Sequence, residues 1–194
     1  MPESHNASPD MEPRPISRII FVGFMGSGKT TVGYALAKKL GWTYYDLDWY
    51  IESRWHTTVT KLFEQQGEER FRQIEHNLLH EIAEFEHVII GCGGGTPCHF
   101  DNMDYLNKQG LTIYLRATEE VLYHHLITAR VQRPLWHNVS PDKQRETLHQ
   151  LLQQREPFYL QAQHIVDISP TQELSDMSST LNTITHIIEG TTAL

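Results

Sequence analysis

The chain has 194 residues, a length that suits one α/β domain with a sizeable core. Its formal net charge of −8 argues against a protein that coats nucleic acid, because such proteins present a basic face. The sequence has no apolar run long enough to cross a membrane and no signal-peptide pattern, so we expect a cytoplasmic protein. Cys92 and Cys98 are expected to be free thiols, because a disulfide scaffold needs more cysteines and a secreted context.

Residues 1–17 are expected to form a disordered leader. Four prolines stand among polar residues there, which leaves little apolar surface to bury. Residues 18–194 are expected to form a single domain, since the sequence shows no internal repeat and no second domain.

An apolar, β-branched run at residues 19–22 leads into the stretch from Gly23 to Thr30, which reads G-x-x-x-x-G-K-[ST]. In this motif, backbone N–H groups surround nucleotide phosphates, Lys29 reaches the terminal phosphates and the Thr30 hydroxyl is placed to bind Mg²⁺. A helical pattern follows until Gly41, so strand, loop and helix stand in the order that the mechanism requires. We therefore favour a nucleotide site over the alternative, a glycine-rich turn with an incidental lysine.

Two acids, Asp46 and Asp48, end the β-type run at residues 43–48. Spaced by two at the carboxyl end of a strand, they are expected to point to the same side, at the edge where open α/β sheets bind ligands. One acid could organise Mg²⁺ through its water while the other orients a substrate hydroxyl. The alternative is that one acid only caps the helix expected from Trp49. We favour the first interpretation, because neither of the next two strands ends in an acid that could serve the metal.

The rest of the chain alternates between helical and β-type patterns. Such alternation after a phosphate-binding first strand implies a parallel sheet covered by helices on both faces. Gly67 is expected to interrupt a helix, and Pro157 to close one. We expect helices at residues 49–55, 58–64, 68–85, 118–129, 142–155 and 172–188, strands at residues 87–92, 111–115 and 164–168, and an irregular polar segment at residues 130–141.

Arg72 and Glu75 are three residues apart in an expected helix, so they share a face. If that face is solvated, the pair contributes little; if it lines a cleft, Glu75 can orient the Arg72 fork toward a carboxylate. The glycine run that follows, Gly93, Gly94 and Gly95, suits a place where a ligand meets the backbone closely. A merely flexible loop is the alternative.

Three further arginines are candidates for binding an anion. Arg130 and Arg133 open the irregular segment, which in a protein that holds a triphosphate suggests a lid that excludes water and brings positive charge to the phosphoryl group. Arg155 lies at an expected helix end, where a cation favoured by the helix C-terminus is a serious alternative. We set aside a zinc site at His76 and His80, because the sequence between them lacks the glutamate of zinc proteases.

Together these stretches resemble the shikimate kinase family. The phosphate loop, the Asp46-Leu47-Asp48 pair and Phe71-Arg72-x-Ile74-Glu75 match its pattern, as do the glycine run, Arg133-Pro134-Leu135 and Arg155-x-Pro157-x-Tyr159. The resemblance covers about residues 19–168. It implies a P-loop fold of the nucleoside-monophosphate-kinase type: three α/β/α layers, five parallel strands in the order 2-3-1-4-5, a lid at about residues 130–141 and a helical substrate-binding insert at about residues 47–76.

The resemblance also implies an activity: Mg²⁺-dependent, in-line transfer of a phosphoryl group from ATP to the 3-hydroxyl of shikimate, a step of chorismate and aromatic amino acid biosynthesis. It implies that Lys29, Asp48 and Arg133 are catalytic, and that Thr30, with Asp46 through water, holds Mg²⁺. The implied contacts with the ATP phosphates are Gly26, Ser27, Gly28, Lys29, Thr30, Thr31 and Arg133; those with shikimate are Asp48, Arg72, Gly93, Gly94, Gly95 and Arg155, beside an apolar wall of Val59, Phe63 and Phe71.

Two other functions are weighed against this one. A related small-molecule kinase, such as a gluconate kinase, would also take a polyhydroxy carboxylate, so arginines alone do not decide; the motifs around Arg72 and Arg155 favour shikimate. A nucleotide-binding regulator without catalysis is disfavoured, because the residues that the chemistry needs are present. The expected partners are ATP and shikimate, with no nucleic acid and no membrane, for a chain that acts as a monomer. Arg130 and Pro170 are candidates for the adenine contact.

Overall fold

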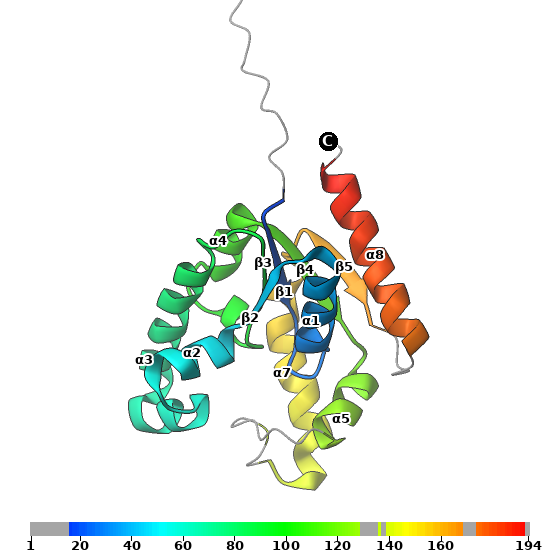
Figure 1. Cartoon of the computed structure of the whole chain (residues 1–194). Coiled ribbons are helices and arrows are strands. Elements are labelled where there is room, and N and C mark those ends of the chain that lie inside the picture. The colour runs from blue at the N-terminus through cyan, green and yellow to red at the C-terminus, as the bar shows by residue number, and fades with distance from the viewer. Residues whose placement is uncertain (1–15, 129–135, 137–138, 169–173, 193–194) are drawn as a thin grey trace, which may run out of the picture.

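Five parallel strands form one central sheet, in the order β2-β3-β1-β4-β5 (Figure 1). The computed structural model describes residues 16–128, 136, 139–168 and 174–192. Its strands are β1 (Arg18–Val22), β2 (Thr43–Asp46), β3 (Val88–Gly91), β4 (Leu111–Arg116) and β5 (His164–Asp167). Its helices are α1 (Lys29–Leu40), α2 (Leu47–Trp55), α3 (Val59–Ile82), α4 (Asn102–Gln109), α5 (Glu119–Thr128), α7 (Gln144–Tyr159) and α8 (Leu174–Thr192), with short 3-10 segments η1 (Thr96–Cys98) and η2 (Pro141–Lys143). The expected three-layer fold and strand order are confirmed.

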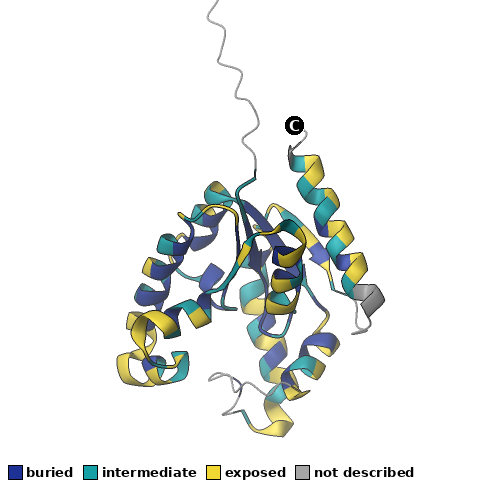
Figure 2. Ribbon diagram, viewed as in Figure 1, coloured by how far each residue is buried: buried dark blue, intermediate teal, exposed yellow. Residues whose placement is uncertain are grey.

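Alternate residues of β1 belong to two separate hydrophobic cores, one on each face of the sheet. Ile19 and Phe21 pack with residues of α1 and α8. Ile20 and Val22 pack with residues of α2, α3, α4, α5 and α7. All four side chains are fully buried, as expected for a strand covered on both faces. Figure 2 shows the result as central strands, β1, β3 and β4, that are buried between helices whose outer surfaces are exposed.

The parallel register brings the ends of β1, β2 and β3 to one edge of the sheet. Asp46, the last residue of β2, lies beside Gly91 of β3, and Gly91 lies beside Phe21 of β1. The N–H of Cys92 continues this pairing by donating to the Phe21 carbonyl at 3.0 Å. The phosphate loop, the acids and the glycine run therefore all leave the sheet at the edge where open α/β sheets bind ligands.

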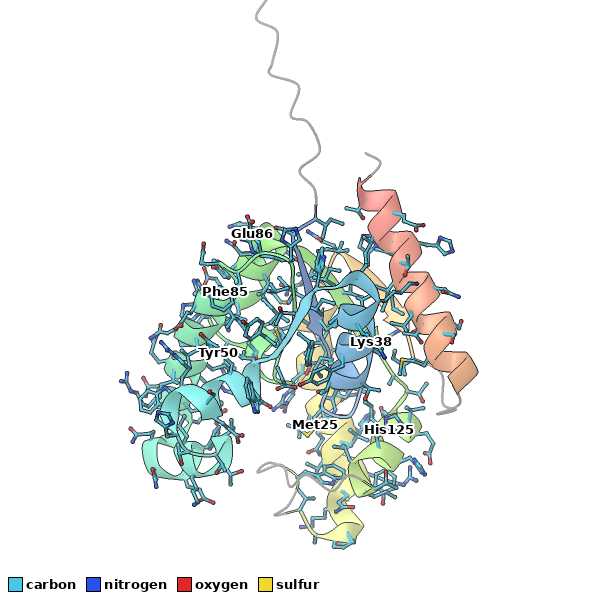
Figure 3. All side chains as sticks on the ribbon, in the orientation of Figure 1. Met25, Lys38, Tyr50, Phe85, Glu86 and His125 are labelled. Carbon is cyan, nitrogen blue, oxygen red and sulfur yellow. The ribbon has the colours of Figure 1, made fainter. Side chains whose placement is uncertain are left out.

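Helices α2 and α3 form an insert beside this edge. The Thr58 hydroxyl starts α3 by accepting the N–H of Lys61 at 3.2 Å. Gly67, with φ 76° and ψ 169°, bends α3, as its sequence position predicts. The two helices expected on either side of Gly67 are thus halves of one kinked helix. Tyr50 of α2, labelled in Figure 3, ties α2 to α3 by donating to Glu81 Oε1 at 2.7 Å.

The prediction of a strand at residues 43–48 is wrong at its C-terminal end. β2 stops at Asp46, and α2 begins at Leu47. The Asp46 carboxylate accepts the N–H groups of Asp48 and Trp49, at 3.1 and 3.4 Å, and this cap starts the helix. Asp48 therefore lies in the first turn of a helix, and the prediction that both acids extend from a strand is wrong for Asp48.

The helix expected to end at Arg155 continues to Tyr159, through Pro157. A proline in the last turn removes one backbone hydrogen bond, whose net contribution is about 0.5–1.5 kcal/mol. Tyr159 is fully buried at the end of this turn. Full burial of a large side chain contributes about 1.5–3 kcal/mol, which offsets much of the cost of about 3 kcal/mol that a proline brings inside a helix through the lost bond and the clash of its ring with the preceding turn.

The other expected elements are present with ends that differ by a few residues. Most of the expected leader and lid, and the first residues of the last expected helix, lie outside the described residues. Among the helices that the structure describes, none combines the length and the apolar character needed to cross a bilayer.

Candidate active site

Three glycines of the phosphate loop, Gly23, Gly26 and Gly28, have positive φ angles between β1 and α1. Gly26 and Gly28 have φ values of 85° and 87°, which favour glycine because it has no Cβ. Gly28 stands directly before α1, which begins at Lys29. The positive end of the α1 dipole therefore lies at the loop, an arrangement that binds anions.

The Lys29 ammonium group lies across this loop. Its Nζ donates to the carbonyl oxygens of Gly23 and Phe24, each at 2.8 Å, and lies 3.4 Å from Ser27 Oγ. Ser27 is fully buried, whereas Thr31 is exposed in the first turn of α1. The Lys29 side chain thus connects both ends of the loop, from Gly23 and Phe24 to Ser27.

Thr30 and Asp46 lie side by side although they belong to different elements. Thr30 Oγ1 donates to Asp46 Oδ2 at 2.9 Å. The other carboxylate oxygen, Asp46 Oδ1, accepts the two N–H groups at the start of α2. Asp46 therefore caps a helix and faces the phosphate loop at the same time, so the two alternatives weighed for this acid are compatible.

A cavity of about 420 Å³ opens between the insert, the glycine run and α7. Met25, labelled in Figure 3, brings the phosphate loop into its wall. Residues expected from the sequence supply most of the lining: Thr30, Asp46, Asp48, Arg72, Glu75, Gly93, Gly94, Gly95 and Arg155, with the apolar Val59, Phe63 and Phe71. Trp49, Glu52 and Thr60 complete it without a sequence signal of their own.

Asp48 faces the glycine run from the first turn of α2. Its Oδ1 lies 2.9 Å from the point that a Cβ on Gly93 would occupy. Glu75 Oε1 lies 3.2 Å from the same point. The missing side chain of Gly93 therefore leaves room for two carboxylates, and Asp48 reaches the cavity from a helix instead of from a strand.

Arg72 and Glu75 form a buried ion pair, not a solvated one. Arg72 Nη1 lies 2.7 Å from Glu75 Oε2, and the two residues are 7% and 1% exposed. The Arg72 guanidinium also lies over the Phe71 ring, with Cζ 5.2 Å from the ring centre. Arg72 Nε is buried and has no hydrogen-bond partner among the described residues. An unpaired buried donor beside a cavity favours an acceptor supplied by a ligand.

The glycine run packs against both arginines of the cavity. A Cβ on Gly95 would lie 2.6 Å from Arg72 Nη2, which is too close for any side chain. A Cβ on Gly94 would lie 3.6 Å from Arg155 Nη1. The Gly94 carbonyl accepts a hydrogen bond from the Tyr159 hydroxyl at 2.5 Å. These contacts favour a fixed, closely packed run over a merely flexible loop.

Arg155 reaches the cavity from α7, one turn before that helix ends. Its Cζ lies 5.8 Å from the centre of the Phe24 ring in the phosphate loop. Arg155 thus stands between the phosphate loop and the glycine run. This position favours a role in the site over that of a cation which only stabilises a helix end.

Burial governs the protonation of three groups around the glycine run. It raises the pKa of the Tyr159 hydroxyl, so this group stays a hydrogen-bond donor to Gly94. Cys92 and Cys98 are free, as the sequence predicts. Burial raises the pKa of both thiols, and that of Cys98 to about 11 although Arg155 draws it down. Both cysteines are therefore thiols at neutral pH.

Sequence reasoning missed three residues that the structure joins to the site. Thr96 and Asn102 are fully buried and connect to Glu75 through hydrogen bonds. His125, labelled in Figure 3, places Nδ1 2.7 Å from the Gly26 carbonyl oxygen of the phosphate loop. Only Thr96 carries a signal in the sequence, because it directly follows the glycine run.

Several residues that the sequence suggested as ligand contacts do not belong to the site that the described residues form. Arg133, Arg130 and Pro170 lie outside the described residues. The rings of His76 and His80 lie tilted at 50° to each other, with centroids 4.2 Å apart. In the part of the chain that the structure describes, no three His, Cys, Asp or Glu side chains gather in a metal-binding group.

Comparison with known proteins gives one consistent family. The family model described as shikimate kinase matches residues 25–185. The shikimate kinase of Bacteroides thetaiotaomicron is 43% identical over 172 residues, which cover 89% of this chain and 98% of that protein. A crystal structure of shikimate kinase from the same species has a TM-score of 0.86 at 42% identity and covers 90% of this chain and 99% of that one.

A second solved structure carries a ligand. Shikimate kinase from Acinetobacter baumannii, in complex with shikimate, has a TM-score of 0.80 at 29% identity and covers 90% of this chain and 94% of that chain. The family match spans most of the sequence, and the relatives align over nearly their whole length. The chain belongs to the shikimate kinase family.

Proposed function

We propose that this chain transfers the γ-phosphoryl group of ATP to the 3-hydroxyl of shikimate. One observation carries the choice of acceptor: two arginines, Arg72 and Arg155, line the same cavity as Asp48, and Arg72 Nε is a buried donor with no partner among the described residues. Such a cavity fits a small molecule with one carboxylate and several hydroxyls. Shikimate has this chemistry, and membership of the family supports the choice.

In the acceptor half of the site, charged side chains bind the carboxylate of the acceptor, and the backbone and apolar side chains bind its ring. Arg72 and Arg155 bind the carboxylate, and the backbone of the run from Gly93 to Gly95 contacts the ring hydroxyls. The apolar wall, Val59, Phe63 and Phe71, covers the faces of the carbocyclic ring. Glu75 holds the Arg72 fork toward the cavity through its 2.7 Å ion pair.

The donor half is the phosphate loop. Residues Gly26 to Thr31 cradle the phosphates with backbone N–H groups and the positive end of α1, and Lys29 moves from the loop carbonyls to the terminal phosphates. Gly94 joins the two halves, because a Cβ on it would lie 3.2 Å from the Met25 backbone nitrogen. The acceptor is therefore held directly beside the phosphates.

The residues present fit a Mg²⁺ ion. A threonine hydroxyl and a carboxylate, Thr30 Oγ1 and Asp46 Oδ2, lie 2.9 Å apart beside the loop, and hard oxygen donors of this kind suit Mg²⁺. Thr30 would bind the ion directly and Asp46 through water. Bound there, Mg²⁺ supplies charge neutralisation on the phosphate oxygens.

The reaction then needs a group that accepts the proton of the 3-hydroxyl, and it needs the attacking oxygen in line with the bond that breaks. Asp48 accepts the proton of the 3-hydroxyl as its oxygen bonds to the γ-phosphorus and the bond from that phosphorus to the β–γ bridging oxygen breaks. The products are shikimate 3-phosphate and ADP. Arg133, in a lid at residues 130–141, would add positive charge to the transferring group and exclude water. All these residues come from residues 18–194 of one chain, so a single domain can act as a monomer.

A panel assay tests this function. Release of ADP is measured with shikimate, gluconate and other sugar acids at fixed ATP and Mg²⁺; we expect turnover with shikimate alone. Turnover of gluconate, with no turnover of shikimate, would instead indicate a gluconate kinase. Calorimetric binding of ATP without transfer to any acceptor would instead indicate a nucleotide-dependent regulator.

A further inference from the structure

A chain of polar side chains, buried except for the half-buried His76, continues from the Arg72–Glu75 ion pair in the cavity wall. We call it the Thr96 network, made of Glu75, Thr96, Asn102 and His76. Thr96 Oγ1 lies 2.6 Å from Glu75 Oε1, Asn102 Nδ2 lies 2.8 Å from the Thr96 carbonyl oxygen, and His76 Nδ1 lies 2.6 Å from Asn102 Oδ1. Glu75, Thr96 and Asn102 are at most 1% exposed.

The direction of each hydrogen bond follows from the groups themselves. A carboxylate only accepts, so the Thr96 hydroxyl donates to Glu75 Oε1 while Arg72 Nη1 donates to Oε2. The Asn102 amide nitrogen donates to a carbonyl, which makes its Oδ1 the acceptor facing His76. His76 Nδ1 therefore carries a hydrogen. Both oxygens of the Glu75 carboxylate are thus held, one by the arginine and one by the threonine.

Thr96 itself is fixed at three points. Its N–H donates to the Gly93 carbonyl at 3.1 Å, its carbonyl accepts from Asn102, and its hydroxyl binds Glu75. Its neighbour Gly95 lies against the Arg72 guanidinium. Thr96 does not line the cavity. It can act on a ligand only through the residues that it holds.

We propose that Thr96 is a positioning residue for the substrate carboxylate: its hydroxyl locks Glu75, and Glu75 locks the direction of the Arg72 fork. Asn102 and His76 hold Thr96 in place from behind. This inference rests on the proposed function only in taking shikimate as the source of the carboxylate. Without the Thr96 hydroxyl, one oxygen of a buried carboxylate loses its donor and the Glu75 side chain can rotate, so Arg72 no longer presents one fixed geometry.

The test separates positioning from packing. Thr96→Val keeps the shape and removes the hydroxyl, Thr96→Ser restores the hydroxyl, and Thr112→Val is the matched control. Thr112 is also a fully buried threonine, but its hydroxyl accepts the N–H of Gln163 at 3.0 Å and it does not line the cavity.

We expect Thr96→Val to raise the KM for shikimate about five- to tenfold, while kcat and the KM for ATP change less than about twofold. Thr96→Ser should recover most of this loss. Thr112→Val should lower thermal stability without a change in either KM. A folded Thr96→Val protein with an unchanged shikimate KM, or a serine variant that behaves like valine, would overturn the proposal.

A second measurement does not depend on shikimate turnover. The ¹H–¹⁵N signal of Arg72 Nε, assigned with an Arg72→Lys variant, reports the environment of the guanidinium in the free protein. We expect it to shift or broaden in Thr96→Val and to return in Thr96→Ser, with no change in Thr112→Val. An Arg72 signal that is the same in all variants would contradict the proposal. The wild-type chain could fail to phosphorylate shikimate while this signal still depends on Thr96. That result would contradict the proposed function but would support the positioning role of Thr96.

Discussion

The Tyr159 hydroxyl donates a hydrogen bond to the Gly94 carbonyl at 2.5 Å, across 65 residues of sequence. This bond links the last turn of α7, which also carries Arg155, to the glycine run on the other side of the cavity. This contact therefore couples the position of Arg155 to that of the backbone that faces it.

Tyr159→Phe keeps the ring and removes the hydroxyl, which binds Gly94 and also interacts with the Arg155 side chain. The Gly94 carbonyl loses its donor, so we expect a KM for shikimate several-fold higher, with a stability loss of about 1–3 kcal/mol. Steady-state kinetics and thermal melting measure the two effects. Tyr114→Phe is the control, because its hydroxyl donates to Glu156 at 3.2 Å and not to the glycine run. Equal KM changes in both variants would argue against a specific role for the Gly94 bond.

Gly95→Ala places a methyl group 2.6 Å from Arg72 Nη2, so the guanidinium has to move. We expect shikimate binding to weaken about tenfold or more, while ATP binding stays close to that of the wild type. Isothermal titration with each ligand checks this. Gly190→Ala in α8 is the control, since a Cβ there meets nothing within 4 Å. Unchanged shikimate affinity in Gly95→Ala would mean that Arg72 does not contact the ligand.

Asp48→Asn keeps the shape of the side chain and removes its capacity as a proton acceptor. We expect kcat to fall about a hundredfold or more, with ATP affinity retained. The matched variant is Asp104→Asn, which changes an exposed acid that also lies in the first turn of a helix, α4, away from the cavity. A kcat for Asp48→Asn within a few-fold of the wild type would exclude Asp48 as the base.

Arg155→Lys keeps the charge and loses the two-pronged fork. Because a carboxylate is bound best by that fork, we expect the KM for shikimate to rise well beyond any change in the KM for ATP. Arg145→Lys on the same helix is the control, as Arg145 is exposed and pairs with Glu120 at 2.8 Å. Equal kinetic constants for the two variants would show that Arg155 does not bind the substrate carboxylate.

Alkylation of the cysteines tests the pKa of Cys98. Burial raises that pKa to about 11, so the reactive thiolate is about a hundredfold scarcer at pH 8 than for an unperturbed thiol. Iodoacetamide labelling of Cys98, followed by mass spectrometry, should therefore be slow at pH 8 and keep rising up to about pH 11. Cys92, which is more deeply buried, should label only when the protein unfolds. A labelling rate that levels off near pH 9 would contradict the raised pKa.

The parts of the molecule that depend on local pattern follow from the sequence. The phosphate loop has a fixed spacing, and the three-residue separation of Arg72 and Glu75 is enough to predict a shared helix face. Sheet order follows from the family resemblance and agrees with the observed register. For the phosphate loop and the Arg72–Glu75 pair, a short stretch contains the whole signal.

The rest depends on contacts between distant segments. Asp46 ends its strand because its own carboxylate caps the next helix, and the β-type pattern through Asp48 hides that competition. Thr96 and Asn102 meet Glu75 and His76 across 21 and 26 residues, and only the place of Thr96 directly after the glycine run marks either of them in the sequence. Pro157 lies inside α7, where the burial of Tyr159 in the same turn offsets much of its cost, and only the packed structure reveals that burial.

The kink at Gly67 divides the site into parts of unequal local stability. Before the kink, Leu62 is the only buried residue of α3, whereas Phe71 and Leu79 after the kink belong to the core. Segments with few buried contacts open at a much lower free energy than core strands, and they open without global unfolding. The tip that carries Val59 and Phe63 should therefore exchange its amide hydrogens early, while β1 and the start of α1 stay protected. The acceptor can enter through this fluctuation while the nucleotide platform remains intact.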